Sequence, residues 1–199
     1  MNTTIRQLMI GLLLLALLTA CGGQAATQAP DAVTTDPPRN TLSPTNAAGA
    51  ETRTIRHAMG ETEVQDSPQR VVVLDTGELD SVLALGITPV GAVTAIAKDG
   101  VFPNYLQDRI ANIELVGTTQ EPNLEKIAAL QPDLILSSKL RHEEIYDELS
   151  QIAPTVFSEA VGVVWKENLL LNAEALGKKA EAEQLLADYQ ARLEALQQA

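Results

Sequence analysis

Three basic residues are noteworthy in an acidic chain because each follows a segment expected to be a buried strand. Lys98 follows residues 88–93, and Lys139 and Arg141 follow residues 133–136. The loops after the carboxyl ends of parallel strands meet at one edge of the sheet, so these side chains should converge. Basic groups gathered there would suit the oxygen atoms of an anionic ligand. A solvated surface charge is the competing interpretation of each residue taken alone.

Three further residues are candidates for the same edge. Thr76 lies in the triplet Asp75-Thr76-Gly77, which has the letters of an aspartic-protease site. That chemistry needs paired carboxylates on a β-rich fold, so we interpret the triplet as a strand-to-helix turn with a capping side chain. His142 is a weaker candidate for the rim. Trp165, the one tryptophan, could pack over a ligand or fill the seam between two lobes. The seam is favoured, because an aromatic residue just before an amphipathic helix usually belongs to a core.

Other site chemistries are disfavoured by the residues available. The sequence has two histidines and one cysteine, which argues against a direct transition-metal site and against an iron–sulfur cluster. His57 lies on a charged hairpin and is interpreted as solvated. We find no G-x-S-x-G motif for a hydrolase. The net charge of -12 argues against a nucleic-acid partner.

The elements that position these residues alternate between strand and helix. Such alternation predicts an α/β fold with a mostly parallel sheet flanked by helices. A small hairpin is expected within residues 54–65. Residues 116–140 read as loop, short helix, turn and buried strand. Strands are expected at 70–74, 88–93, 133–136 and 155–157, and helices at 78–85, 104–110, 124–130, 143–152, 161–176 and 178–199.

The N-terminal part has a different composition. Residues 1–20 contain an uncharged run that is short for a membrane span and is typical of a secretory signal. Small residues directly before Cys21 resemble a bacterial lipobox, which implies lipidation of Cys21 and a lipid anchor in the membrane. Residues 21–52 are predicted to be this lipidated cysteine and a disordered linker, which would hold the domain on the order of 30 Å from the membrane.

Several separated motifs resemble ABC-transporter substrate-binding proteins for ferric siderophores and cobalamin, the type III periplasmic binding proteins. The resemblance extends from Arg53 to the end of the chain and is carried by the following motifs: Arg70-Val71-Val72-Val73-Leu74, Leu83-Ala84-Leu85-Gly86-Ile87-Thr88-Pro89-Val90-Gly91, Gly117, Glu121-Pro122-Asn123-Leu124-Glu125-Lys126-Ile127, Leu130 and Pro132-Asp133-Leu134-Ile135. It implies an N-terminal ligand-binding lobe at 53–165. It also implies that residues 166–199 form a helical segment and the start of an interlobe helix, with the second lobe missing.

The resemblance also implies a function without covalent chemistry and without an intrinsic cofactor. A ferric siderophore would be held by residues such as Lys98, Lys139 and Arg141, with ferric iron present only inside that complex. Glu125 would dock on the ABC permease, which a cytosolic ATPase drives. The protein would be anchored on the outer face of the cytoplasmic membrane.

The loop from Ser137 to His142 favours a hydroxamate or citrate-type siderophore. The alternatives are cobalamin or haem binding by the same fold, and a surface-anchored scaffold or adhesin.

Overall fold

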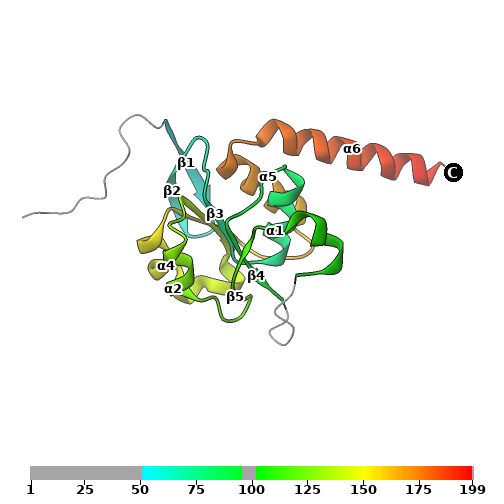
Figure 1. Ribbon diagram of the computed structural model, residues 1–199. Coiled ribbons are helices and arrows are strands. Elements are labelled where there is room, and N and C mark those ends of the chain that lie inside the picture. Colours follow the sequence, from blue (N-terminus) through cyan, green and yellow to red (C-terminus); the bar gives the residue numbers. More distant parts are fainter. Residues whose placement is uncertain (1–50, 96–101, 199) are drawn as a thin grey trace, which may run out of the picture. The chain divides into compact units, whose positions relative to one another are not determined.

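The computed structural model describes residues 51–95 and 102–198. The predictions for the signal segment, for Cys21, for all but the last two residues of the linker and for Lys98 lie outside the described residues. The rest of the chain contains a five-stranded sheet, a separate hairpin and a set of helices (Figure 1).

The sheet is parallel throughout, with the strand order β5-β4-β3-β6-β7. This arrangement confirms the expected α/β fold with a parallel sheet flanked by helices. The strands are β3 at Val71–Val73, β4 at Gly91–Thr94, β5 at Glu114–Thr118, β6 at Leu134–Ser138 and β7 at Thr155–Ser158.

The uniformly apolar strands are explained by cover on both faces of the sheet. Val71 and Val73 of β3 belong to one buried cluster, which also contains residues of α1 (Thr76–Ala84) and α5 (Trp165–Leu176). Alternate residues of the sheet, such as Val72, belong to a second cluster with residues of α2 and α4. Because successive side chains point to opposite faces, a strand covered on both sides must be apolar at every position. The second pair of helices comprises α2 at Leu124–Ala129 and α4 at Tyr146–Ile152.

The hairpin is attached to both the sheet and a helix. Strands β1 (Thr52–His57) and β2 (Gly60–Gln65) pair in antiparallel fashion, as predicted. Arg53 of β1 forms an ion pair with Asp66 at 3.0 Å and donates to the carbonyl oxygen of Ala175 at 3.2 Å. His57 is not simply solvated, because its Nδ1 accepts from the backbone N–H of Phe157 at 3.3 Å.

The structure differs from the predicted elements in several places. Strand β5 was expected to be a loop, because Gly117 and Thr118 interrupt its apolar pattern. Strand β6 continues through Ser138, so Ser137 and Ser138 belong to the sheet and not to a loop. The loop that was expected to carry the basic residues is a helical turn, α3 at Lys139–His142, followed by the 3-10 turn η2 at Glu143–Ile145. The segment near residue 104 is a 3-10 helix, η1 at Asn104–Arg109.

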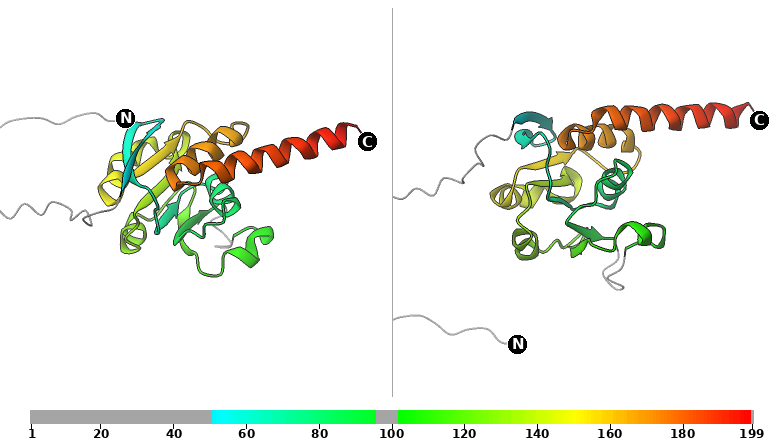
Figure 2. Two further views of the ribbon diagram at one scale, coloured as in Figure 1. Left: turned by 90° about the horizontal axis from the view of Figure 1, so that it is seen from above. Right: turned by 45° about the horizontal axis from the view of Figure 1, so that its top comes forward.

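Two helices complete the described chain. Helix α5 ends at Gly177, whose left-handed φ of 70° closes the helix, and α6 then runs from Lys179 to Gln197. Only the first part of α6 packs on α5, and the remainder extends away from the sheet (Figure 2). None of the helices in the described ranges combines the length and the apolar character that crossing a bilayer requires.

Candidate ligand-binding edge of the sheet

Buried polar side chains gather at the carboxyl ends of the strands. Each strand of the sheet contributes at least one, either as its last residue or as one of the next few residues. Parallel sheets place ligand sites outside these ends, since loops from adjacent strands converge there. The buried polar residues at this edge are Asp75, Thr94, Thr119, Ser137, Ser138, His142 and Ser158.

Arg141 is held at this edge by a buried carboxylate. Its Nε lies 3.2 Å from Oδ2 of Asp75, and the arginine side chain keeps 39 % of its surface exposed against 4 % for the aspartate. The other oxygen of Asp75 accepts the backbone N–H of Gly77 at 3.0 Å and so caps α1. Asp75 therefore fixes the guanidinium through Nε, and the other nitrogen atoms can donate hydrogen bonds to a ligand from the solvent side.

Lys139 lies on the same helical turn but is shared between two surface carboxylates. Its Nζ is 4.0 Å from Glu143 and 3.9 Å from Glu159. Such exposed pairs are weak, so the ammonium can exchange these partners for another anion at small cost. The structure thus brings Arg141 and Lys139 to one edge.

His142 is turned inward and supports the turn. Its Nδ1 lies 2.6 Å from Oγ of Ser137, and its Nε2 lies 3.0 Å from the carbonyl oxygen of Thr119. Because a carbonyl can only accept, Nε2 carries the proton and Nδ1 accepts from the serine. Both ring nitrogens are used, and a direct ligand contact by His142, as predicted from the sequence, would require one of these bonds to break.

The pairing of Ser137 with His142 does not make a reactive nucleophile. The serine is fully buried and the histidine is 3 % exposed, so a substrate carbonyl cannot approach the hydroxyl oxygen. The hydrogen bonds instead fasten the carboxyl end of β6 to the segment after β5.

Protonation of His142 is expected to destabilise the domain. Burial lowers the pKa of His142 below 6.5, so as the pH falls through 6.5 the unfolded chain binds a proton before the folded chain does. This contribution to the free energy of unfolding is therefore fully present above pH 6.5 and decreases below it. The measurement is urea unfolding of the wild type and of His142→Gln between about pH 5 and pH 8.

The comparison with the variant is needed because Glu78 acts in the opposite direction. Burial, and then the charge of Asp75, raise the pKa of Glu78 from 4.5 to about 7. The contribution of Glu78 to the free energy of unfolding is therefore lost as the pH rises through that range. His57, whose pKa burial also lowers, adds to the effect of His142. The prediction would be contradicted if the difference in the free energy of unfolding between the wild type and His142→Gln did not change with pH.

The other two candidates lie beside the edge. Thr76 is the first residue of α1, and the capping residue is its neighbour Asp75. Trp165 begins α5, is 41 % exposed, and packs edge-on against Tyr189 of α6 with ring centroids 5.1 Å apart. Its ring also borders a hollow of about 270 Å³ between α1 and α5. Trp165 is therefore both part of a helix–helix seam and accessible from outside.

Two functional candidates were missed from the sequence. Glu78 is fully buried in the first turn of α1, and its Oε1 accepts from Oγ of Ser158 at 2.7 Å. The spacing of Asp75 and Glu78, three residues apart across a helix start, could have indicated two neighbouring carboxyl groups. Nothing local indicates Ser158, which is 80 residues away along the chain.

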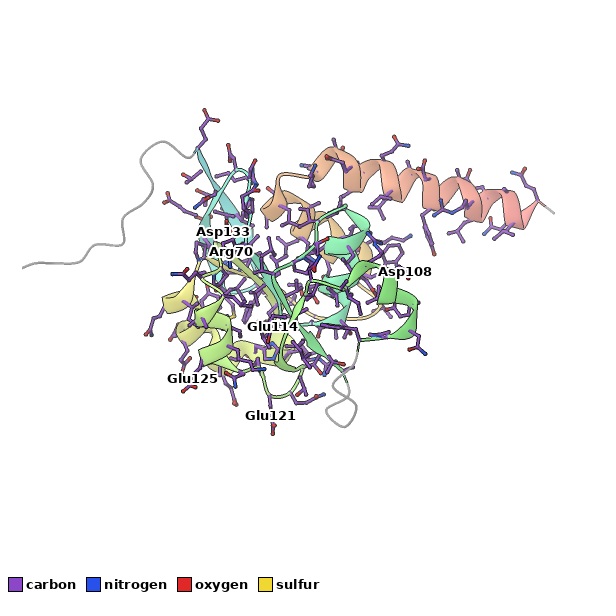
Figure 3. All side chains as sticks on the ribbon, in the orientation of Figure 1. Arg70, Asp108, Glu114, Glu121, Glu125 and Asp133 are labelled. Atoms are coloured by element: carbon purple, nitrogen blue, oxygen red, sulfur yellow. The ribbon has the colours of Figure 1, made fainter. Side chains whose placement is uncertain are left out.

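Glu125 lies on a separate outer surface. Asn123 caps α2 by accepting the N–H of Lys126 at 2.9 Å, which places Glu125 in the first helical turn. Figure 3 shows Glu125 and Glu121 pointing outward, and both are exposed. Glu125 forms no ion pair with any residue in the described part of the chain.

The described residues offer no ready metal centre. Within 51–95 and 102–198, no three histidine, cysteine, aspartate or glutamate side chains are grouped closely enough to hold a metal ion. The edge of the sheet presents cationic donors instead, which suit a ligand that supplies its own anionic oxygen atoms.

Comparison with known proteins identifies the fold family. The model of the periplasmic binding protein family matches residues 71–199. Among curated relatives, a probable siderophore-binding lipoprotein of Bacillus subtilis, YfiY, is 44 % identical over 147 residues, covering 73 % of this chain and 45 % of the relative. The Fe(3+)-citrate-binding protein YfmC of the same organism is 39 % identical over 142 residues, covering 70 % and 44 %.

Solved structures lead to the same family. Staphylococcus aureus SirA complexed with staphyloferrin B aligns with a TM-score of 0.70 at 43 % identity, over 74 % of this chain and 50 % of SirA. The chain spans about half the length of the curated relatives it matches. On the fold and the match across residues 71–199, the chain belongs to the periplasmic binding protein family.

Proposed function

We propose that this chain carries the ligand-binding lobe of a substrate-binding lipoprotein that captures a ferric siderophore for an ABC importer. The observation that carries the proposal is the arrangement of Arg141, half-exposed over buried Asp75, with Lys139 on the same turn. These cations can bind the anionic oxygen atoms that surround the iron without displacing any of them. Iron would arrive only as the siderophore complex, with no covalent step by the protein.

A citrate or hydroxamate type of siderophore fits this edge best. Arg141 can offer paired N–H groups, which match the geometry of carboxylate oxygens. One relative at 39 % identity is named as binding Fe(3+)-citrate, which supports this preference. Cobalamin or haem is the second candidate, favoured by the exposed Trp165 and the hollow beside it, because aromatic walls suit macrocycles.

Glu125 is proposed to be the docking residue for the permease. It is exposed, it lies in the first turn of α2 on the outer surface, and it makes no ion pair within the described residues. An arginine of a membrane partner could therefore pair with it without first breaking a contact. The ATPase that drives transport would act on the permease from the cytosol.

The protein is proposed to be tethered by lipid at Cys21 to the outer face of the cytoplasmic membrane. The small residues before Cys21 and the polar segment after it support the tether. Acyl chains on that cysteine would supply the anchoring free energy. A scaffold or adhesin would use the same anchor but would have no affinity for a small ligand.

Fluorescence of Trp165 tests the proposed ligand. It is the single tryptophan, so quenching reports on one position. Ferric citrate, a ferric hydroxamate and a ferric catecholate are titrated into this chain and into a version continued through a second lobe. We expect saturable quenching by the citrate or hydroxamate type, with higher affinity in the longer version, because a ligand between two lobes gains contacts from both.

Arg141→Gln should weaken that binding roughly ten- to hundredfold, since a hydrogen bond to a charged group contributes about 1.5–3 kcal/mol. The matched control is Arg192→Gln, which removes an exposed positive charge from α6 and should leave the affinity unchanged. If no ferric siderophore quenches either version while haem or cobalamin does, the second candidate replaces the first. Absence of binding by all of them would favour the scaffold.

A further inference from the structure

Two carboxyl groups are buried at the start of α1, close to the edge that carries Arg141. Asp75 follows β3 and is 3 % exposed, and Glu78 lies one helical turn later and is fully buried. Arg141 is the cation paired with Asp75, at 3.2 Å. Two neighbouring buried carboxyl groups, of which only Asp75 is paired with a cation, cannot both ionise without strong repulsion.

The surroundings of Glu78 favour its protonated form. Oε1 accepts the Ser158 hydroxyl, while Oε2 is buried and has no hydrogen-bond partner among the described residues. Burial is the main cause that raises the pKa of Glu78 to about 7, followed by the charge of Asp75; the bond from Ser158 acts in the other direction. Glu78 therefore keeps its proton up to about neutral pH. With Oε1 occupied by Ser158, Oε2 is the oxygen atom left to hold that proton.

Few other charged groups face this pair. The imidazole of His142 is neutral and is fastened to Ser137 and to the Thr119 carbonyl. Helix α5, which packs on α1, presents apolar Leu169 and neutral Asn172 among its buried residues. The remaining charged side chains on the adjacent elements point elsewhere: Lys139 pairs with Glu143 and Glu159, Lys166 lies over the rings of Trp165 and Tyr189, Asp80 accepts from Tyr105, and Glu167 and Glu174 are exposed.

We propose that Asp75 and Glu78 form a proton-holding pair that competes with the ligand for Arg141, so that capture of an anionic ligand is accompanied by uptake of a proton. This inference rests on the proposed function. When a ligand oxygen takes over the guanidinium, Asp75 keeps its negative charge in a buried site but loses its cation. A proton from the solvent then binds to Glu78, which donates a hydrogen bond to Asp75 and compensates for the loss.

The pair would act as a selector for ligand charge. An anionic ligand provides the arginine with a partner as good as Asp75, and the singly protonated pair repels the ligand less than two ionised carboxylates would. A neutral ligand provides no such partner, so Arg141 stays on Asp75 and no proton is taken up. The affinity for an anionic ligand should increase as the pH is lowered toward and just below 7, where Glu78 gains its proton.

The first experiment needs no ligand. The carboxyl resonance of Glu78 is followed by NMR in protein labelled with ¹³C-glutamate, and Glu78→Gln assigns it. We expect a titration midpoint near pH 7 in the wild type. Arg141→Gln should raise that midpoint by about one pH unit, a tenfold change in proton affinity, because Asp75 then has no cation. Ser158→Ala should raise it as well.

An ordinary midpoint near 4.5, or a midpoint that Arg141→Gln leaves unchanged, would overturn the proposal. Arg141→Lys keeps the charge and is the conservative control, for which the midpoint should stay close to that of the wild type. Because Arg141 is half-exposed, these variants should retain the fold.

The second experiment measures proton uptake during binding of ferric citrate. Calorimetric titrations at pH 7 in two buffers of different ionisation enthalpy give the number of protons exchanged, expected to be up to about half a proton per molecule, since Glu78 is then about half protonated. Glu78→Gln should lose this uptake. Glu144→Gln, which alters an exposed glutamate in η2, should keep it.

The outcomes separate the two proposals. If ferric citrate binds and the uptake is equal in the wild type and Glu78→Gln, the proton-holding pair is wrong and the proposed function stands. If no ferric siderophore binds to any variant, either in this chain or in the version continued through a second lobe, the proposed function is wrong, and the ligand-linked part of this proposal is overturned with it.

Discussion

Charge reversal at Glu125 should abolish uptake of the ferric siderophore while leaving the affinity for the ligand unchanged. Glu125 lies on the exposed face of α2, whereas Arg141 and Lys139 lie on α3 at the edge of the sheet. A lysine at position 125 would repel an arginine of the permease where the glutamate would attract it. Like charges placed together at an interface disfavour a complex by several kcal/mol, enough to remove productive docking.

The measurement combines two assays on a chain continued to the length of its relatives. Uptake of ⁵⁵Fe delivered as the siderophore is measured in cells, and ligand affinity is measured by quenching of Trp165. Glu63→Lys on strand β2 is the matched control, since it also reverses the charge of an exposed glutamate, here on the hairpin. Weakened ligand binding by Glu125→Lys, or uptake at the wild-type rate, would remove Glu125 from the docking surface.

Replacing Gly117 by alanine should destabilise the domain by about 3 kcal/mol or more. Gly117 lies in β5 with a φ of 120°, a conformation that side chains disfavour, and it forms an isolated bridge with Pro122. A Cβ atom there would overlap the carbonyl oxygen of Glu121 and lie 3.1 Å from the backbone nitrogen of Asn123. Both contacts are with backbone, which cannot rotate away, so the turn before α2 would have to open.

Urea unfolding of Gly117→Ala and Gly60→Ala separates the overlap from the backbone strain. Gly60 has a similar φ of 129°, and a Cβ there would meet no atom within 4 Å. Its substitution should therefore cost about 1 kcal/mol from strain alone. Equal losses in the two variants would show that the close approach in β5 contributes nothing. The turn opened by Gly117→Ala also presents Glu121 and leads into α2, so the docking surface should be disordered with it.

Much of the fold could be predicted because its signals are local. The apolar run at Val71–Val73 and the stretch Leu134–Leu136 specify strands covered on both faces, which requires helices on either side. Asn123 and Asp75 start helices through their own side chains. Strand β5 escaped prediction because its pairing with β4 supplies the order that its own sequence lacks.

The site was predicted less completely. Arg141 and Lys139 were assigned to the correct edge, because a polar segment after a buried parallel strand has to lie there. His142 was expected at the rim, yet it is buried, since a hydroxyl donor from Ser137 and a carbonyl acceptor from Thr119 hold its two ring nitrogens. Whether a polar residue points outward or inward depends on which partners the fold provides, and a one-dimensional pattern does not contain them.

The sequence by itself determined the alternating elements, the parallel sheet and the edge that carries the cations, and its motifs indicated the family by resemblance. The elements and the sheet follow from periodicity, caps and the rule that parallel strands are joined through right-handed crossovers. Only the tertiary structure decided that Asp75 holds Arg141, and that Glu78 meets Ser158 from 80 residues away. The physical reason is that burial and pairing set the charge of a carboxyl group, and both depend on neighbours that are brought together only when the sheet is complete.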